Sequence, residues 1–212
     1  MQLIDYLYTN LYIRHIPNYF NFINKNLTGC GSVLELGCAN NSVLQYFPKR
    51  YYSCATDIFL PYLKESRRKK IHDSYILAEM SQLCIKPKSF DCVLGLGLLE
   101  HLEKKEALKL LELMQNIARK KIIINMPNGF LRQDAFDGNI YQKHKSGWIC
   151  EDLRRLGFSA YGFFGLKSLR KEYGKLRYRP RPLWFIISEL TQVFTFKIPQ
   201  YAAEIVYIKE LL

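Results

Sequence analysis

The feature that most constrains the fold of this sequence is a regular alternation of short apolar runs and amphipathic segments that begins at Ser32. Each apolar run is rich in Val, Ile, Leu or Tyr and ends at turn-forming or charged residues, which is typical of buried strands. The strands expected on this basis are 32–36, 52–56, 74–78, 90–94 and 121–126, and the helices between and after them are 60–68, 104–118 and 151–156. The alternation predicts a doubly wound, mostly parallel α/β sheet with right-handed crossovers.

The two ends of the chain depart from this central pattern. At 212 residues the chain has the length of one well-cored domain, so we expect a single domain over 1–212. Residues 1–31 are expected to form a helical cap, and residues 167–200 a basic and apolar insert before the last strand. The segments expected in these parts are one or two helices in 2–27, a strand at 159–166, a helix at 183–196 and a final strand at 203–209.

Charge and cysteine content limit the class of protein. Lys and Arg outnumber Asp and Glu by 31 to 19, which gives a net charge of +12 and favours anionic partners. None of the six cysteines forms a Cys-x-x-Cys pair, so a zinc ribbon or a redox motif is not expected. The N-terminus lacks the pattern of a signal peptide, and no stretch has the length of a membrane span. We therefore expect a cytoplasmic protein with reduced thiols.

The residues that follow the expected strands carry the chemistry. The carboxyl ends of parallel strands meet at one edge of the sheet, and ligands bind there. Gly37 in a turn of small residues follows the first strand, and the lone carboxylate Asp57 follows the second. Such a turn lets backbone approach a ligand, and a carboxylate at a strand end can accept hydrogen bonds from a ribose diol. Taken singly, Gly37 is as well explained by a plain tight turn, and Asp57 by a helix cap.

Four segments in order resemble the motifs of a known family. VLELGC, AEMSQL, SFDCVLGLGLLEHL and IIINMPNG are similar to the successive motifs of class I S-adenosylmethionine (SAM)-dependent methyltransferases, including small-molecule members of the methyltransferase type 11 group. The resemblance runs from about Ser32 to Phe163. It implies a seven-stranded Rossmann-like sheet, methyltransferase (transferase) activity and SAM as cofactor.

The resemblance also assigns a cofactor site, position by position. Gly37, Cys38 and Ala39 would line the methionine moiety, with Glu35 near its amino group. Asp57 would bind the ribose hydroxyls, and Ile58 would cover the adenine. Glu79 would lie near the adenine amine, with Met80 stacked beside it. Gly95 and Leu96 would border the sulfonium. A dinucleotide-binding site is disfavoured, because the turn after the first strand lacks the Gly-x-Gly-x-x-Gly pattern that seats a pyrophosphate.

The glycine turn departs from the family pattern. Ala39 and Asn41 stand where glycines are usual. Alanine is tolerated unless its φ is positive, and asparagine adopts left-handed conformations more easily than most residues. We expect a modified turn that still binds SAM. A non-catalytic SAM-binding module is the alternative that this departure leaves open.

A long polar loop, 127–148, follows the fifth expected strand and is the best location for acceptor chemistry. His144 is the candidate general base, because an unperturbed imidazole titrates near working pH. The alternatives are that His144 and Ser146 only fix the start of the next helix, or that Asp134, Asp137 and His144 hold a metal. The sequence by itself assigns no metal.

The acceptor is the least determined part. Gly95 to Leu98 stand where methyltransferases of exocyclic base amines carry an Asn/Asp-Pro-Pro-aromatic motif, so base methylation is disfavoured. We expect O-methylation of a small molecule or glycan, for example a lipid- or nucleotide-linked sugar; RNA or protein methylation is the alternative. The basic and apolar segment 170–196 fits either peripheral contact with a membrane or packing over the cleft or in a subunit interface.

Overall fold

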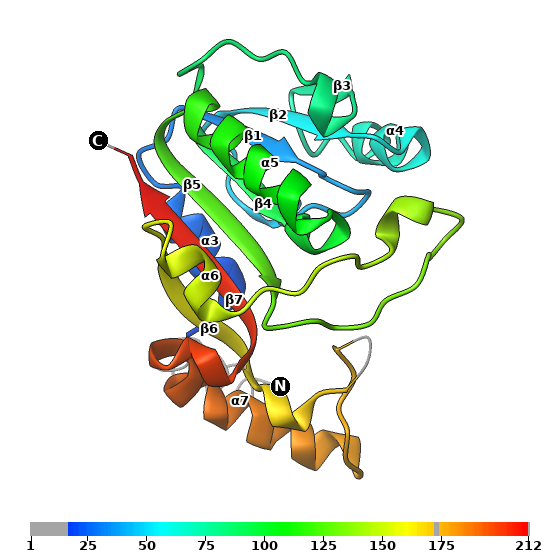
Figure 1. Ribbon diagram of the computed structural model, residues 1–212, viewed down its shortest axis with the longest axis vertical. Helices are drawn as coiled ribbons and strands as arrows, with labels where there is room; N and C mark the ends of the chain where they lie inside the picture. Colours follow the sequence, from blue (N-terminus) through cyan, green and yellow to red (C-terminus); the bar gives the residue numbers. More distant parts are fainter. Residues whose placement is uncertain (1–16, 172–173, 212) are drawn as a thin grey trace, which may run out of the picture.

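The computed structural model describes residues 17–171 and 174–211, and seven strands in this part of the chain form one sheet (Figure 1). The strands are β1 (Ser32–Leu36), β2 (Tyr52–Asp57), β3 (Ser74–Leu77), β4 (Phe90–Leu96), β5 (Ala118–Pro127), β6 (Ser159–Leu166) and β7 (Ala202–Glu210). Their order is β3-β2-β1-β4-β5-β7-β6, and β7 runs antiparallel to both of its neighbours while the other pairs are parallel. The predicted doubly wound, mostly parallel sheet is confirmed.

The helices fall close to their predicted positions. They are α3 (Tyr19–Asn26), α4 (Leu60–Arg68), α5 (Lys104–Ile117), α6 (Cys150–Arg154) and α7 (Arg181–Lys197). Short 3-10 helices are η2 (Val43–Tyr46), η3 (Met80–Gln82), η4 (Leu99–His101), η5 (Ile140–Gln142), η6 (Lys167–Leu169) and η8 (Pro199–Tyr201). The first sixteen residues of the expected N-terminal cap lie outside the described residues. The helical insert before the last strand is α7, as expected.

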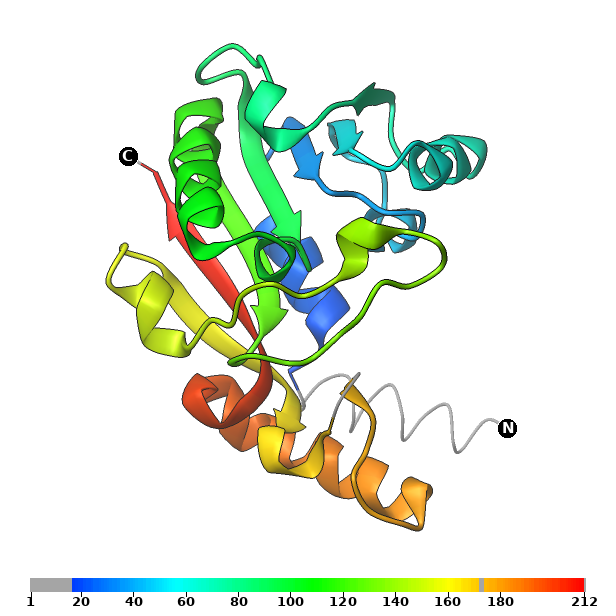
Figure 2. The same cartoon turned by 45° about the vertical axis from the view of Figure 1, so that its right-hand side comes forward.

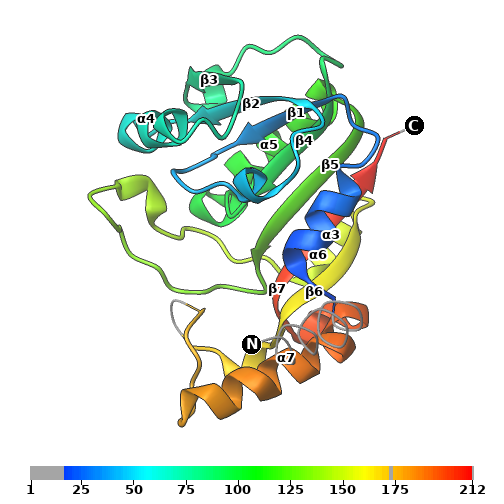
Figure 3. The same ribbon diagram turned by 180° about the vertical axis from the view of Figure 1, so that it is seen from behind.

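Helices cover both faces of the sheet because successive residues of a strand point to opposite sides. Ile122 and Ile124 of β5 pack with α5 and α6 in one core cluster, whereas Ile123 packs with α3 in the other. Figure 1 shows α5 in front of the strands, and Figure 3, from behind, shows α3. Burial on both faces explains why β1, β4 and β5 are continuous apolar runs instead of alternating ones.

The edge of the sheet at β6 is covered by α7 in an unusual way. The residues of α7 that face the strand are polar: Ser188, Gln192 and Thr195 are buried. Gln192 Nε2 donates to Gly162 O (2.8 Å), and its Oε1 accepts from Gly165 N (3.0 Å). Glycine is required at both strand positions, because an added Cβ would overlap the α7 backbone. A sheet edge that would otherwise expose backbone groups is thus closed by side-chain amides and hydroxyls.

The opposite face of α7 is apolar and exposed. Leu190 is 63% exposed. The apolar residues of α7 that are about half exposed or more are Leu183, Phe185, Ile186, Leu190, Val193 and Phe194. Figure 2 shows α7 beneath the end of the sheet, away from α5. Across residues 17–171 and 174–211, none of the helices combines the length and apolar character needed to cross a bilayer.

Candidate cofactor and acceptor site

A cavity of about 770 Å³ opens at the carboxyl ends of β1, β2 and β4, where the fold class places its ligands. Of the ten residues assigned to the cofactor, all except Gly95 lie on its wall. Gly95 lies behind the wall: a Cβ there would meet Cε of Met114 at 3.3 Å. The glycine at this position therefore serves the contact between β4 and α5.

The turn after β1 is held in a left-handed conformation at two residues. Gly37 has φ of 66°, and an added Cβ would lie 2.7 Å from Cδ1 of Leu98. Ala39 also has positive φ, 49°, which costs about 1–2 kcal/mol for a residue with a Cβ. Ala39 therefore has the positive φ at which alanine is unfavourable in this turn. Asn41 is not among the described residues with positive φ, so its tolerance of that conformation is not used.

Asp57 joins the turns after β1 and β2. Its carboxylate accepts a hydrogen bond from Ala39 N (2.9 Å) and another from Phe59 N (2.8 Å). The second bond comes from the N-cap residue of α4, which itself has no side-chain capping bond. Asp57 therefore holds the turn before α4 and does not cap the helix, and it also lies on the cavity wall. Burial raises the pKa of Asp57, and the backbone N–H groups act against this shift. One carboxylate thus fixes the distance between the two turns.

Glu35 is buried at the bottom of the cavity with two partners that sequence reasoning did not assign to it. Its Oε2 accepts from Ser42 Oγ (2.6 Å) and from Nε2 of His72 (2.7 Å). Ser42 also caps η2 by accepting from Leu44 N (3.1 Å). His72 was missed because it precedes β3, whereas Glu35 lies in β1, and only the sheet, with β2 between these strands, brings the two residues together. The sequence signal that could have pointed to such a partner was Glu35 itself, because a charged residue within a buried strand needs a partner.

The loop between β5 and α6 is long and runs past the ends of the strands (Figure 2). Asn139, Tyr141, Gln142 and Lys145 from this loop line the cavity. The loop is tied to the β4 exit, because the backbone N–H groups of Lys145 and Ser146 donate to Glu100 O at 2.8 and 3.1 Å. The polar loop expected to carry acceptor chemistry is thereby placed against the end of β4.

Glu100, His101 and His144 come together where this loop meets η4. The His101 and His144 rings are edge-on, with centroids 4.7 Å apart. His101 lines the cavity, whereas His144 is buried next to it and is not part of the wall. Asp134 and Asp137 are exposed on the loop, so the structure does not bring them together with His144.

The protonation states in this cluster are set by burial. Burial raises the pKa of Glu100 to about 8, with the negative charge of Glu204 adding to the effect. Burial lowers the pKa of His101 to about 4, and neighbouring His144 lowers it further. The pKa of His144 is also lowered by burial, against the effect of its bond to Leu131 O. Both imidazoles are therefore neutral at pH 7, with a lone pair available on each ring.

A second cavity, of about 500 Å³, lies on the far side of the same loop. Four of its lining residues are cationic: Lys167, Arg170, Lys171 and Arg177. Arg170 is half-buried, and its guanidinium donates to Phe164 O (3.1 Å) and to Ser188 Oγ (3.2 Å). The remaining charged residue is Glu204, whose pKa is raised by burial. The cavity is therefore suited to an anionic group.

Comparison with known proteins agrees with this architecture. A family model described as a methyltransferase domain matches residues 34–121, which include β1 to β4 and the turns on the cavity wall. No protein of curated function matches the chain by sequence.

Solved structures with a similar fold include a SAM-dependent methyltransferase from Archaeoglobus fulgidus (18% identity, TM-score 0.57, covering 96% of this chain and 100% of that one). A SAM-dependent methyltransferase from Clostridium acetobutylicum ATCC 824 aligns at 13% identity and TM-score 0.57, over 99% and 98% of the two chains. The plantazolicin methyltransferase BpumL, solved with S-adenosylhomocysteine, aligns at 14% identity and TM-score 0.53, over 92% and 80%.

At such low identity, the solved structures show only that the fold is similar. The family model matches the strands that build the large cavity. Residues 34–121 thus match a methyltransferase domain, and the chain has the fold of SAM-dependent methyltransferases of known structure.

Proposed function

We propose that the enzyme transfers the SAM methyl group to a hydroxyl of a small molecule or glycan. The observation that carries this proposal is the cluster of buried Glu100 and His144 with half-buried His101 at the exit of β4, where the methyl acceptor has to meet the cofactor. An alcohol must lose its proton during transfer, and neutral imidazoles suit that task. The turn after β4 has no Asn/Asp-Pro-Pro-aromatic sequence, which argues against amine methylation of bases.

In this proposal SAM fills the large cavity in the orientation that its wall suggests. The left-handed turn at Gly37 to Ala39 holds the methionine part, with Glu35 near its amino group. Asp57 accepts hydrogen bonds from the ribose hydroxyls, and Ile58 and Met80 cover the adenine with Glu79 at its amine; Leu96 borders the sulfonium. The support is that these side chains share one wall, to which β1, β2, η3 and β4 and the turns after β1 and β2 contribute.

The reaction is an in-line displacement. The acceptor oxygen forms a bond to the methyl carbon, and the electron pair of the S–C bond returns to sulfur, which leaves S-adenosylhomocysteine. The acceptor proton passes to the imidazole pair, in which His144 remains the candidate base and His101 reaches the cavity. The sulfonium is already activated, so the protein contributes mainly proximity, orientation and removal of this proton.

We further propose that the acceptor carries an anionic group, as a lipid- or nucleotide-linked sugar does. The second cavity supports this because Lys167, Arg170 and Arg177 face it and it shares the β5–α6 loop with the cofactor cavity. Arg and Lys side chains bind phosphate by charge-assisted hydrogen bonds. A phosphate held there would leave the rest of the acceptor to extend toward His101.

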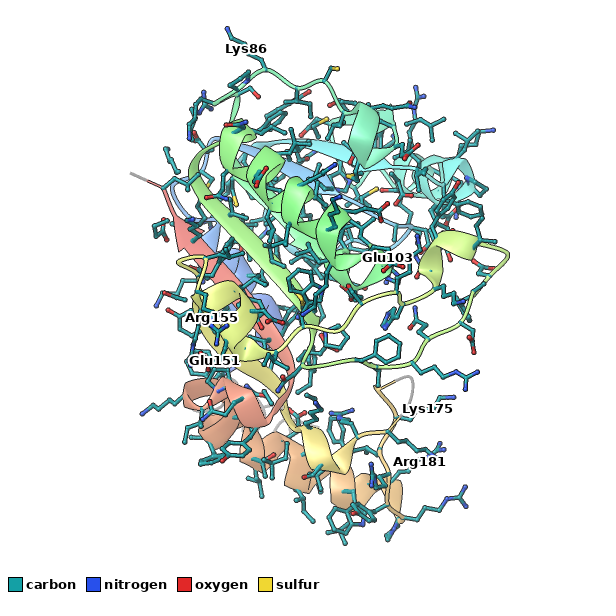
Figure 4. The ribbon with its side chains drawn as sticks, viewed as in Figure 1. Lys86, Glu103, Glu151, Arg155, Lys175 and Arg181 are labelled. Atoms are coloured by element: carbon teal, nitrogen blue, oxygen red, sulfur yellow. The ribbon has the colours of Figure 1, made fainter. Side chains whose placement is uncertain are left out.

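The outer face of α7 suggests contact with a membrane surface that contains anionic lipid. Its exposed apolar residues lie beside a basic flank, and Figure 4 shows Lys175 and Arg181 near the start of the helix. Apolar side chains at the headgroup boundary with Lys and Arg around them are typical of helices that lie on a bilayer. We propose a cytoplasmic enzyme, since all six cysteines are free thiols, with peripheral membrane contact through α7.

Thermal unfolding with and without S-adenosylhomocysteine tests the cofactor assignment. A ligand at about a hundred times its dissociation constant adds roughly 2.7 kcal/mol to the free energy of unfolding. We expect this shift in the wild type and its loss in Asp57→Ala. Absence of a shift in the wild type at millimolar ligand would instead favour a non-catalytic module, with Ala39 as the reason.

RNA or protein methylation is the second candidate, favoured by the net charge of +12. Binding of RNA oligonucleotides at increasing salt would distinguish it. A protein that neutralises several phosphates loses affinity steeply with salt. Tight, strongly salt-dependent binding followed by methyl transfer to RNA would replace the small-molecule proposal.

A further inference from the structure

We propose that Glu100, His101 and His144 form a binding site for one divalent transition-metal cation on the acceptor side of the cavity. The site itself is independent of the substrate, whereas its role in catalysis rests on the proposed O-methylation. Within the described residues, these three form the one group of His, Cys, Asp or Glu side chains with ligand atoms close enough to hold an ion.

The spacing of the ligand atoms fits a cation with modest movement. One carboxylate oxygen and one nitrogen of each ring all lie within 4.8 Å of one another. Bonds of about 2.0–2.2 Å from N and O ligands bring neighbouring ligand atoms to roughly 3 Å apart. Binding would therefore draw the three side chains inward from positions that already face one another.

The tautomer of both histidines is the one that a metal requires. His101 Nδ1 lies 3.3 Å from Lys143 O, and His144 Nδ1 lies 2.6 Å from Leu131 O. A carbonyl oxygen only accepts, so each Nδ1 carries the proton and each Nε2 keeps its lone pair. Metal-ligating histidines almost always donate their other N–H in this way, which fixes the ring orientation.

Glu100 has a buried carboxyl oxygen without a hydrogen-bond partner, and the fold alone does not explain it. Its side chain is 5% exposed, and Oε2 has no hydrogen-bond partner. Leaving a buried carboxyl oxygen unpaired is unfavourable, and a bound cation would remove that cost. The side chain cannot easily leave, because the carbonyl of Glu100 accepts two hydrogen bonds from the β5–α6 loop.

The ligand types indicate the class of cation. Two imidazoles and one carboxylate suit Mn²⁺, Fe²⁺, Co²⁺ or Zn²⁺, whereas Mg²⁺ and Ca²⁺ prefer sites made of oxygen alone. Three protein ligands leave coordination positions open, and His101 lies on the cavity wall. An acceptor hydroxyl that occupies an open position has a lower pKa. With the metal bound, the two imidazoles would be ligands and could not act as the base. The O–H bond of the acceptor would then break with release of the proton to solvent instead of to His144, and the oxygen would attack the methyl group.

The test measures metal binding without any acceptor. Mn²⁺ is titrated into the purified protein and followed by the loss of the free-ion electron paramagnetic resonance signal; Co²⁺ is followed by its d–d absorption. We expect one ion per chain in the wild type and at least about a tenfold loss of affinity in Glu100→Gln and in His144→Asn. The double variant Asp134→Asn, Asp137→Asn is the control and should bind the ion as the wild type does, because both carboxylates are exposed on the same loop.

The same variants are examined for the thermal shift with S-adenosylhomocysteine. A retained shift shows that a variant is folded and that the cofactor cavity is intact, so loss of Mn²⁺ then reports on the site. Absence of Mn²⁺ and Co²⁺ binding in a wild type that binds S-adenosylhomocysteine would overturn the metal site and leave O-methylation with His144 as base. Loss of Mn²⁺ in the Asp134/Asp137 variant but not in Glu100→Gln would also overturn it.

Discussion

The two halves of the sheet build their sites differently. On the cofactor side, the assigned residues on the cavity wall lie in the last residues of β1, β2 and β4 or within a few residues after β1, β2 and β3. On the acceptor side, His144 comes from the middle of a long loop and meets Glu100 and His101 from η4. The first arrangement follows from sheet geometry; the second depends on how one loop folds back over the edge.

The halves also differ in where the polar residues of their helices lie. α5 buries an apolar stripe that includes Ala107, Leu111 and Met114. α7 buries polar residues against β6 and exposes apolar ones, because its inner face has to satisfy the backbone of an edge strand. The usual assumption that the apolar face of a helix points inward is correct on one side of this molecule and wrong on the other.

The largest expected effect tests the close approach of α7 to β6. Gly165→Ala should lower the free energy of unfolding by roughly 2–5 kcal/mol, because the new Cβ meets the backbone of Ser188 and φ is positive. Gly29→Ala is the matched control: its φ is also positive, but nothing lies within 4 Å of the new Cβ. Chemical denaturation of both variants measures the difference. Equal destabilisation would show that α7 does not depend on this contact.

The next effect tests the buried pair on the cofactor side. His72→Phe should lower the free energy of unfolding by about 1–3 kcal/mol, because Glu35 loses one of its two partners while remaining buried. We also expect weaker binding of S-adenosylhomocysteine, measured by isothermal titration. Ser42→Ala removes the other partner and should act in the same direction. Wild-type affinity in both variants would mean that the orientation of Glu35 does not matter for the cofactor.

A smaller effect, of opposite sign, is expected at the strained turn. Ala39→Gly should raise the free energy of unfolding by up to about 1 kcal/mol, since relief of positive φ outweighs the greater freedom of glycine in the unfolded chain. Asn41→Gly should give no such gain, because Asn41 is not in a left-handed conformation. Differential scanning calorimetry of both variants measures this. A gain from Asn41→Gly alone would reverse our description of the turn.

The smallest effect on stability is expected on the outer face of α7. Ile186→Ser combined with Leu190→Ser should change the free energy of unfolding by less than about 0.5 kcal/mol, because both side chains are largely exposed. Sedimentation with vesicles that contain phosphatidylserine should nevertheless fall clearly relative to wild type. Vesicles of phosphatidylcholine alone are the control for charge. Unchanged sedimentation in the variant would remove α7 from any membrane contact.

The sequence by itself determined the order of the elements and the chemistry of the turns on the cofactor side. Apolar runs that end at Gly37 or Asp57 are local signals, and parallel strands bring their carboxyl ends to one edge whatever the rest of the chain does. The fold class and nine of the residues on the cavity wall could be predicted for this reason. Even the consequence of Ala39 could be stated in advance, although only the structure showed that its φ is positive.

Only the tertiary structure decided the contacts between residues distant in the chain. His72, which precedes β3, reaches Glu35 of β1 only because the sheet places both strands beside β2. His144 reaches Glu100 because backbone hydrogen bonds hold the β5–α6 loop against η4. The inward polar face of α7 likewise depends on which strand forms the edge of the sheet. Periodicity and turn residues report on local conformation, whereas the position of a long loop depends on a few distant hydrogen bonds that leave no repeating signal in the sequence.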